Sequence, residues 1–223
     1  MGFRRAAVSF FLRGVTGTIC KIDCREYVEA LSNSKPMIIA MNHTNFLEVP
    51  ILVAHSYPLK VTGVAKTETW DNLFFAFLFN TYRAIPIDRS SAFQEVFAKV
   101  GKAINEGSFV CIFPEGTRSK NGILRKGKAG IVHMALDTGS PILPVVHYGG
   151  EHIWKNMKRF RRTPFCFKAG HPFKINYEGR PDRETREKIL DEVMGQMARL
   201  LPTEKRGVYT EHAERESAYL KFL

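Results

Sequence analysis

His43 and Glu48 are two side chains whose types and spacing suit acid–base chemistry. They belong to the run 42–50, which directly follows the apolar segment 37–41. That segment is bounded by Pro36 and has the composition of a buried strand, so the imidazole lies where a strand ends. If a helix begins just after His43, the carboxylate of Glu48 lies in its first turn, where the helix dipole favours an acid.

From that position Glu48 can fold back toward the imidazole. A carboxylate on one ring nitrogen fixes the tautomer and leaves the other nitrogen as a base toward a substrate hydroxyl. We therefore expect His43 to be a general base assisted by Glu48, with Thr44 or Asn45 capping the helix. The alternative is that His43 only caps a helix and Glu48 is a solvated acid, because His–carboxylate pairs at short spacing are common.

A second polar run, Phe-Pro-Glu-Gly-Thr-Arg-Ser at residues 113–119, also follows an apolar, strand-like segment. Pro114 ends the strand ladder, and Gly116 allows close approach of the backbone. Arg118 carries a planar fork that is suited to phosphate. Both runs lie at strand ends, where α/β folds place their ligands.

Together these runs resemble the glycerolipid acyltransferase family, which includes the 1-acylglycerol-3-phosphate acyltransferases. The first matches the family block Asn-His-x4-acid and the second the block Phe-Pro-Glu-Gly-Thr-Arg-Ser. Two weaker family blocks, at 84–89 and 140–146, occur in the right order, so the resemblance covers roughly residues 36–147. One departure is Glu48, because the family pattern has Asp there. Glutamate is one methylene longer with a similar pKa, so the ion-pairing role can survive with a shifted backbone, and the change affects substrate identity and efficiency more than reaction class.

The resemblance implies transfer of a fatty acyl group from a thioester to the hydroxyl of a lysoglycerolipid. The simplest acceptor is 1-acylglycerol-3-phosphate, which gives phosphatidic acid. His43 would be the base in a direct attack without an acyl-enzyme, and Glu48 would orient and charge it. The implied co-substrate is acyl-CoA or acyl carrier protein, and we expect no cofactor and no metal.

The resemblance also implies a set of substrate-binding residues: Lys66, Arg89, Glu115, Gly116, Thr117 and Arg118. In this interpretation the three cations pair with the phosphate, and Glu115 holds the glycerol or positions Arg118. Backbone amides near Gly116 would stabilise the oxyanion. For Lys66 the alternative is an ordinary surface lysine.

Strands and helical segments alternate along the chain, which indicates an α/β fold. The resemblance implies a single-domain mixed sheet flanked by helices, and 223 residues suffice for one substantial core. We expect an N-terminal membrane-associating segment at 1–33, the acyltransferase domain at 34–201 and a charged, peripheral tail at 202–223.

The net charge of +11 indicates an anionic partner. Apolar and basic residues are interleaved at 3–14, an expected amphipathic helix, and again at 154–162, in a way typical of membrane-surface elements. For the first segment, packing on the domain is the alternative. Segment 70–79 is apolar all round, so it is either a buried helix or a surface for lipid or an acyl chain.

No run approaches the roughly 20 apolar residues of a transmembrane helix, and the N-terminus lacks the form of a cleaved signal peptide. We therefore expect a peripheral or monotopic protein on the cytoplasmic face of an anionic membrane. The four cysteines have no paired metal-binding spacing and indicate reduced, cytosolic thiols.

Other classes of protein fit the sequence less well. A serine hydrolase would carry Gly-x-Ser-x-Gly, which is absent from the chain. A basic nucleic-acid-binding or membrane-binding protein without catalysis would fit the charge, but the common nucleic-acid-binding signatures are missing, and we expect no nucleic-acid partner. Within the acyltransferases, another lysolipid or a lipid acceptor without phosphate is the alternative.

Overall fold

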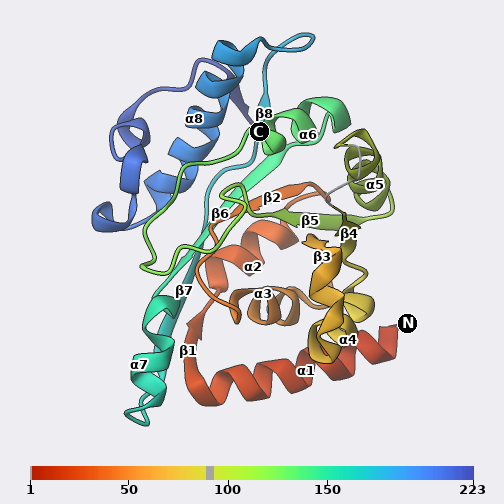
Figure 1. The fold of residues 1–223 in the computed structure, drawn as a ribbon, viewed down its shortest axis with the longest axis vertical. Coiled ribbons are helices and arrows are strands. Elements are labelled where there is room, and N and C mark those ends of the chain that lie inside the picture. Colours follow the sequence, from red (N-terminus) through yellow and green to blue (C-terminus); the bar gives the residue numbers. More distant parts are fainter. Residues whose placement is uncertain (1, 89–92) are drawn as a thin grey trace.

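The computed structural model describes residues 2–88 and 93–223 (Figure 1). Within them, the strands form one nine-stranded sheet in the order β1-β7-β6-β2-β5-β3-β4, with β8 paired to β6 and β9 to β8. The strands are β1 (Cys20–Asp23), β2 (Ile38–Met41), β3 (Lys60–Lys66), β4 (Ile85–Ile87), β5 (Ser108–Ile112), β6 (Ile142–Tyr148), β7 (Thr163–Ala169), β8 (Phe173–Ile175) and β9 (Leu220–Phe222). The α-helices are α1 (Gly2–Ile19), α2 (Arg25–Ser32), α3 (Glu48–Ser56), α4 (Leu73–Tyr82), α5 (Phe93–Asn105), α6 (Gly130–Thr138), α7 (Ile153–Met157) and α8 (Arg183–Leu200).

The central strand β2 is parallel to both of its neighbours, β5 and β6. A parallel strand in this position is covered on both faces, which explains its continuously apolar sequence. Ile38 and Ala40 point into one core cluster, and Ile39 and Met41 into another on the opposite face. Because β7 runs antiparallel to β6, the sheet is mixed and the expected α/β fold is confirmed.

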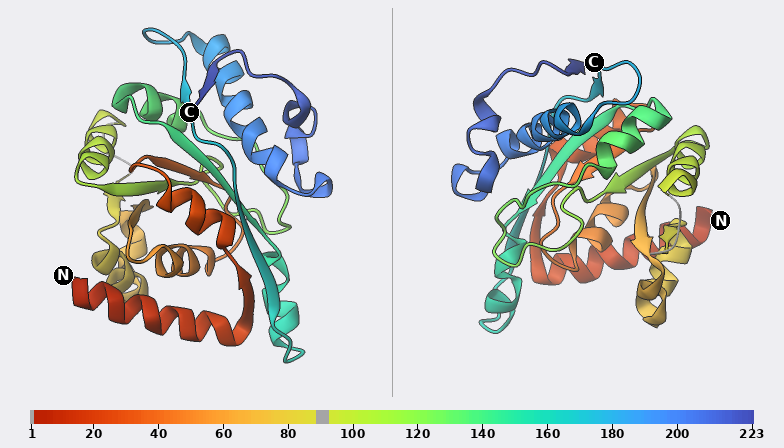
Figure 2. Two further views of the ribbon diagram at one scale, coloured as in Figure 1. Left: turned by 180° about the vertical axis from the view of Figure 1, so that it is seen from behind. Right: turned by 45° about the horizontal axis from the view of Figure 1, so that its top comes forward.

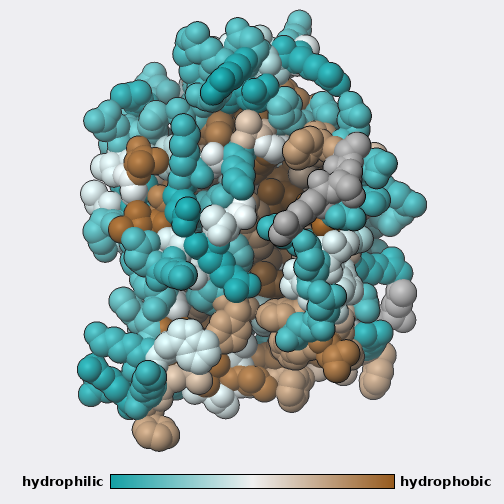
Figure 3. Space-filling view, viewed as in Figure 1, coloured by the Kyte–Doolittle hydropathy of each residue, from teal (hydrophilic) through white to brown (hydrophobic). Residues whose placement is uncertain are grey.

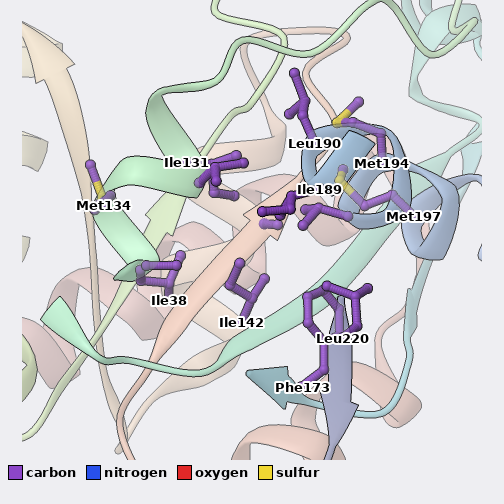
Figure 4. Packing of buried hydrophobic residues seen from close by; sticks show 14 of the residues in the cluster. Ile38, Ile131, Met134, Ile142, Phe173, Ile189, Leu190, Met194, Met197 and Leu220 are labelled. Carbon is purple, nitrogen blue, oxygen red and sulfur yellow. The ribbon is translucent and has the colours of Figure 1, made fainter. Parts of the chain in front are cut away.

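The sheet lies between two layers of helices (Figures 1 and 2). Helices α5, α6 and α8 cover one face, where isoleucine, leucine and methionine side chains pack on β2 and β6 (Figure 4). Helices α2 and α3 cover the other face.

Helix α1 lies along the outside of α3 and also contacts α4 (Figure 1). Leu12 is buried against them, and the Arg13 side chain donates to the carbonyl oxygen of Ala54 at 2.9 Å. Phe3 and Phe10, in contrast, are 89% and 81% exposed. The helix is therefore packed on the domain and also presents an aromatic face outward. None of the helices in the described ranges is long and apolar enough to cross a membrane.

The C-terminal segment, residues 202–223, contributes three buried residues to the core, Tyr209, Ala213 and Leu220, so the expectation that the tail is only peripheral is wrong. Tyr209 and Ala213 are each 1% exposed and pack in the cluster that contains α8. The segment ends in β9, which pairs with β8. Its buried residues are few and separated by charged ones, so the composition of the segment concealed them. The predicted domain boundaries stay predictions.

Candidate active site

The two polar runs leave the sheet at the same edge because β2 and β5 are parallel neighbours. The backbone N–H of His43 donates to Oε1 of Glu115 at 2.7 Å. The N–H of Ser119 donates to the carbonyl oxygen of His43, also at 2.7 Å. Both backbone groups of His43 are thus held by the second run, and the two sequence motifs form one site.

Glu48 is the first residue of α3 and is fully buried. Its Oε1 is hydrogen-bonded to Nδ1 of His43, and its Oε2 accepts from the backbone N–H groups of Thr44 at 2.9 Å and Asn45 at 3.1 Å. The imidazole also stacks on the ring of Phe113, with 4.2 Å between centroids. This geometry confirms the predicted contact between carboxylate and imidazole and rules out a solvated Glu48.

The predicted cap of α3 by Thr44 or Asn45 is wrong. The helix begins at Glu48, the preceding Leu47 is the N-cap residue, and its side chain makes no capping hydrogen bond. The reason is that Glu48 itself binds the free amides of the turn, while Oδ1 of Asn45 accepts from the N–H of Leu47 at 2.8 Å within the loop.

His147, near the end of β6, is a site residue that the sequence analysis missed. It is fully buried, with Nε2 at 2.7 Å from Oε2 of Glu48 and 3.0 Å from the carbonyl oxygen of Asn42. The side chain of Asn42 in turn accepts from the N–H of His147 at 2.8 Å and donates to its carbonyl oxygen at 2.9 Å. The available signal was one imidazole in an otherwise apolar strand, and only the strand order places it beside β2.

The two buried carboxylates of the site have opposite pKa shifts. Burial alone raises the pKa of Glu48, but His147 and His43 beside it lower that pKa to about 2. For Glu115 burial prevails over the backbone hydrogen bonds from His43 and Arg125, and its pKa is raised. Glu48 is therefore charged at neutral pH and can stabilise a positive charge on the His43 ring.

A cavity of about 720 Å³ opens beside His43, within the size range of small-molecule sites. Figure 3 shows a hollow near the centre of this face with hydrophobic side chains in it. Much of the lining is apolar and comes from β3, α3, α4 and the loop before α3: Phe46, Val49, Leu52, Val53, Val64, Phe75, Leu78, Phe79 and Tyr82. The predicted segment 70–79 thus supplies part of this wall, while Leu73, Phe74 and Phe77 of the same helix are exposed.

Four of the predicted substrate-binding residues line the cavity together with His43: Lys66, Gly116, Thr117 and Arg118. Lys66 is the exposed last residue of β3, and Lys128, from the basic loop after Arg118, also lines the cavity. Gly116 has a φ of +67°, in the left-handed region that favours glycine, and the flexible side chain of Lys128 passes over it. Arg89 lies outside the described residues.

Glu115 is placed behind the cavity wall. It is 2% exposed, and its second oxygen, Oε2, accepts from the N–H of Arg125 at 2.9 Å. Because both of its oxygens are bound to backbone amides, Glu115 is better placed to join the two loops than to make the predicted contact with glycerol. The N–H of Gly116 donates to the carbonyl oxygen of Phe113 at 3.0 Å, so that amide is not available to an oxyanion.

The C-terminal segment supports the loop that carries Arg118. The N–H of Leu124 donates to the carbonyl oxygen of Lys205 at 2.8 Å, and the N–H of Gly127 donates to the hydroxyl of Tyr209 at 2.9 Å. Across residues 2–88 and 93–223, no group of three or more His, Cys, Asp or Glu side chains is arranged to hold a metal ion. The site contains two imidazoles, two buried carboxylates, cations and an apolar wall.

A family model described as Acyltransferase matches residues 22–148 of the chain. The chain belongs to this acyltransferase family. The matched residues include both loops and His147.

Among relatives, the chain is 35% identical over 149 residues to the 1-acyl-sn-glycerol-3-phosphate acyltransferase of Cocos nucifera, a match that covers 65% of this chain and 48% of the relative. It is 32% identical over 133 residues to the enzyme of that name from Pseudomonas aeruginosa, covering 57% and 51%. It is 31% identical over 137 residues to 1-acyl-sn-glycerol-3-phosphate acyltransferase beta of Homo sapiens, covering 58% and 48%. The chain thus spans about half the length of these relatives.

The fold is similar to the crystal structure of the 1-acyl-sn-glycerophosphate (LPA) acyltransferase PlsC from Thermotoga maritima. The TM-score is 0.58 at 20% sequence identity, and the match covers 96% of this chain and 81% of that structure. This similarity extends beyond the matched sequence motifs to α8 and the C-terminal segment.

Proposed function

We propose that this protein transfers a fatty acyl group from a thioester to the free hydroxyl of 1-acylglycerol-3-phosphate, giving phosphatidic acid. The observation that carries the proposal is the His43 ring on the wall of an apolar cavity, with its Nδ1 bound to the buried, charged Glu48. The names of the relatives, which are 1-acyl-sn-glycerol-3-phosphate acyltransferases, support this acceptor.

In the proposed reaction, His43 is the general base and Glu48 holds its ring. Because Nδ1 is bound to Glu48, the acceptor hydroxyl gives its proton to Nε2 while its oxygen attacks the thioester carbonyl. The tetrahedral intermediate collapses, the carbon–sulfur bond breaks, and the thiolate takes the proton back from the imidazolium. The side chain of His43 is only 17% exposed, which limits access of water to the base.

The remaining cavity residues suit the two ends of a lysophospholipid, the phosphate and the acyl chain. Lys66, Arg118 and Lys128 present positive charge at the cavity and would pair with the phosphate. The apolar residues of α3 and α4 would hold an acyl chain. One cavity therefore offers both the charge and the apolar surface that a lysophospholipid needs.

The proposal is tested with the purified protein, acyl-CoA and a panel of lysolipids with and without phosphate. We expect activity with 1-acylglycerol-3-phosphate, and a turnover reduced about a hundredfold or more in His43→Ala. Arg118→Lys should raise KM for the phosphorylated acceptor, because an ammonium cannot form the bidentate contact.

Two results would contradict the proposal. More than half of wild-type activity in His43→Ala would remove the base from the mechanism. Arg118→Lys acting equally on acceptors with and without phosphate would make Arg118 structural.

We also propose that the exposed face of α1 contacts an anionic membrane surface. Phe10 and Phe11 on this face are 81% and 65% exposed, and hydrophobic side chains gather along the edge formed by α1 and α4 (Figure 3). Replacing both phenylalanines by serine should weaken sedimentation with anionic vesicles. Val208→Ser, at an exposed position of the C-terminal segment, is the control. Equal binding by both variants would contradict this contact.

A further inference from the structure

The Glu48 carboxylate lies between two imidazoles. Its Oε1 is bound to Nδ1 of His43, and its Oε2 lies 2.7 Å from Nε2 of His147. Only the first of these rings lines the cavity. His147 is fully buried in β6 and does not line the cavity, so it can act on the substrate only through Glu48.

The hydrogen bonds determine which nitrogen of His147 carries the proton. Nε2 faces two acceptors, Oε2 of Glu48 and, at 3.0 Å, the carbonyl oxygen of Asn42. Nδ1 is buried and has no hydrogen-bond partner within the described part of the chain. A proton on Nε2 therefore satisfies two acceptors, whereas a proton on Nδ1 would be buried without one.

The position of the ring is fixed independently of Glu48. The side chain of Asn42 makes two hydrogen bonds to the backbone of His147, just beyond the last residue pair of the β2–β6 ladder. The ring packs on Phe165 and Phe167, with centroid separations of 5.1 Å and 5.6 Å. His147 is thus a rigid donor for a carboxylate that projects from another element.

We infer that His147 is a positioning residue, which holds the second oxygen of Glu48 so that the first oxygen faces His43. The inference rests on the proposed acyltransferase function and deepens it. It also explains why a glutamate, which is longer than the aspartate of the family pattern, can serve at position 48. A glutamate at the start of α3 spans the two rings, and an aspartate at the same position would be one methylene too short to keep both contacts.

The kinetic test compares His147→Phe, which keeps a ring between Phe165 and Phe167 but removes the donor, with His147→Gln, which keeps an N–H donor. We expect His147→Phe to lower kcat about tenfold with KM for both substrates unchanged, and His147→Gln to retain most of the activity. His55→Phe is the control, because it replaces a partly buried imidazole whose ring nitrogen is hydrogen-bonded to Cys24 instead of Glu48, and it should leave kcat unchanged.

A double-mutant cycle separates positioning from general damage. If His147 acts through Glu48, adding His147→Phe to Glu48→Gln should cost almost nothing beyond Glu48→Gln alone. Additive losses, a rise in KM instead of a fall in kcat, or equal losses in the phenylalanine and glutamine variants would overturn the inference.

A second measurement needs neither a variant nor activity. In the 15N spectrum of the wild-type protein with labelled histidine, His147 should be the Nε2–H tautomer, and an Nδ1–H tautomer would overturn the inference. If this tautomer is found but the wild type transfers no acyl group to any lysolipid, the proposed function fails while the arrangement around Glu48 stands.

Discussion

The segments that follow β2 and β5 each contain a buried glutamate, Glu48 at the start of α3 and Glu115 in the second loop, and the pKa values of the two carboxylates shift in opposite directions. Glu48 is bound by two imidazoles and two backbone amides, and its pKa falls to about 2 despite burial. Glu115 is bound by two backbone amides only, and its pKa rises because of burial.

This difference shows that burial does not by itself decide the charge of a carboxylate. Desolvation disfavours the anion in both places, and the number and kind of donors decide the outcome. Glu48 has many donors around its carboxylate and keeps a negative charge next to His43. Glu115 instead links two backbone segments, those of His43 and Arg125. One glutamate of the site therefore serves the chemistry, and the other supports the loops.

The largest expected effect comes from removing the charge of Glu48. Glu48→Gln keeps the size of the side chain but cannot stabilise an imidazolium, so turnover should fall almost as far as in His43→Ala, about a hundredfold. Glu48→Asp keeps the charge and loses reach, which should cost about tenfold, or roughly 1.4 kcal/mol of barrier. Steady-state kcat at saturating acceptor should fall in the order wild type, Glu48→Asp, Glu48→Gln. A glutamine variant as active as wild type would show that the charge has no catalytic role.

Glu115→Gln should have a smaller effect, on the order of tenfold in kcat/KM. Its amide can accept from only one of the two N–H groups, those of His43 and Arg125, so the loops are held less firmly. Because the lost interaction is with backbone, loss of the charge at Glu115 should matter less than at Glu48. Kinetics of both variants on one acceptor measure this, and a larger loss in Glu115→Gln than in Glu48→Gln would reverse the division of roles.

The pH dependence of stability should have opposite signs at the two sites. The lowered pKa of Glu48 means that its charge stabilises the fold above its usual value of 4.5, and this contribution disappears as pH falls toward 2. This contribution of Glu48 to the free energy of unfolding is about 3 kcal/mol, judged from the difference between the usual pKa of 4.5 and the native pKa of about 2. Relative to Glu48→Gln, the wild type should therefore lose stability as pH falls below 4.5.

For Glu115 the pKa is raised, so its native carboxylate takes up a proton before the unfolded chain does. Relative to Glu115→Gln, the wild type should gain stability as pH falls from neutral toward 4.5. Urea unfolding of the wild type, Glu48→Gln and Glu115→Gln between pH 7 and pH 3 measures both trends. Parallel trends for the two variants would contradict the opposite pKa shifts.

The smallest expected effect concerns the support of the second loop from the C-terminal segment. Tyr209→Phe removes the hydroxyl that accepts from the N–H of Gly127, which should lower the free energy of unfolding by about 1 kcal/mol. KM for the phosphorylated acceptor should rise slightly, because this loop carries Arg118 and Lys128. Thr210→Ala, at an exposed neighbouring residue, is the control. A fall in kcat/KM as large as that of Glu115→Gln would mean that the segment acts on the base.

Much of the fold was predictable because apolar periodicity is a local property. The buried strand before Asn42, the helix starting after Asp182 and the alternation of elements all agree with the structure. The C-terminal segment was not predictable in this way. Its burial depends on isolated residues such as Tyr209 and Leu220, which gain their partners only when α8 and β8 are in place.

The sequence by itself determined the chemistry of the site: an imidazole with a carboxylate five residues later, and a second loop with a glycine and an arginine. Local chain geometry is enough to bring Glu48 back to His43. Only the tertiary structure decided that Glu115 holds the backbone of His43 and that His147 binds the far oxygen of Glu48. These contacts join residues 72 and 99 positions apart in the chain, and they exist because the β5-β2-β6 strand order brings three strand ends to one edge of the sheet.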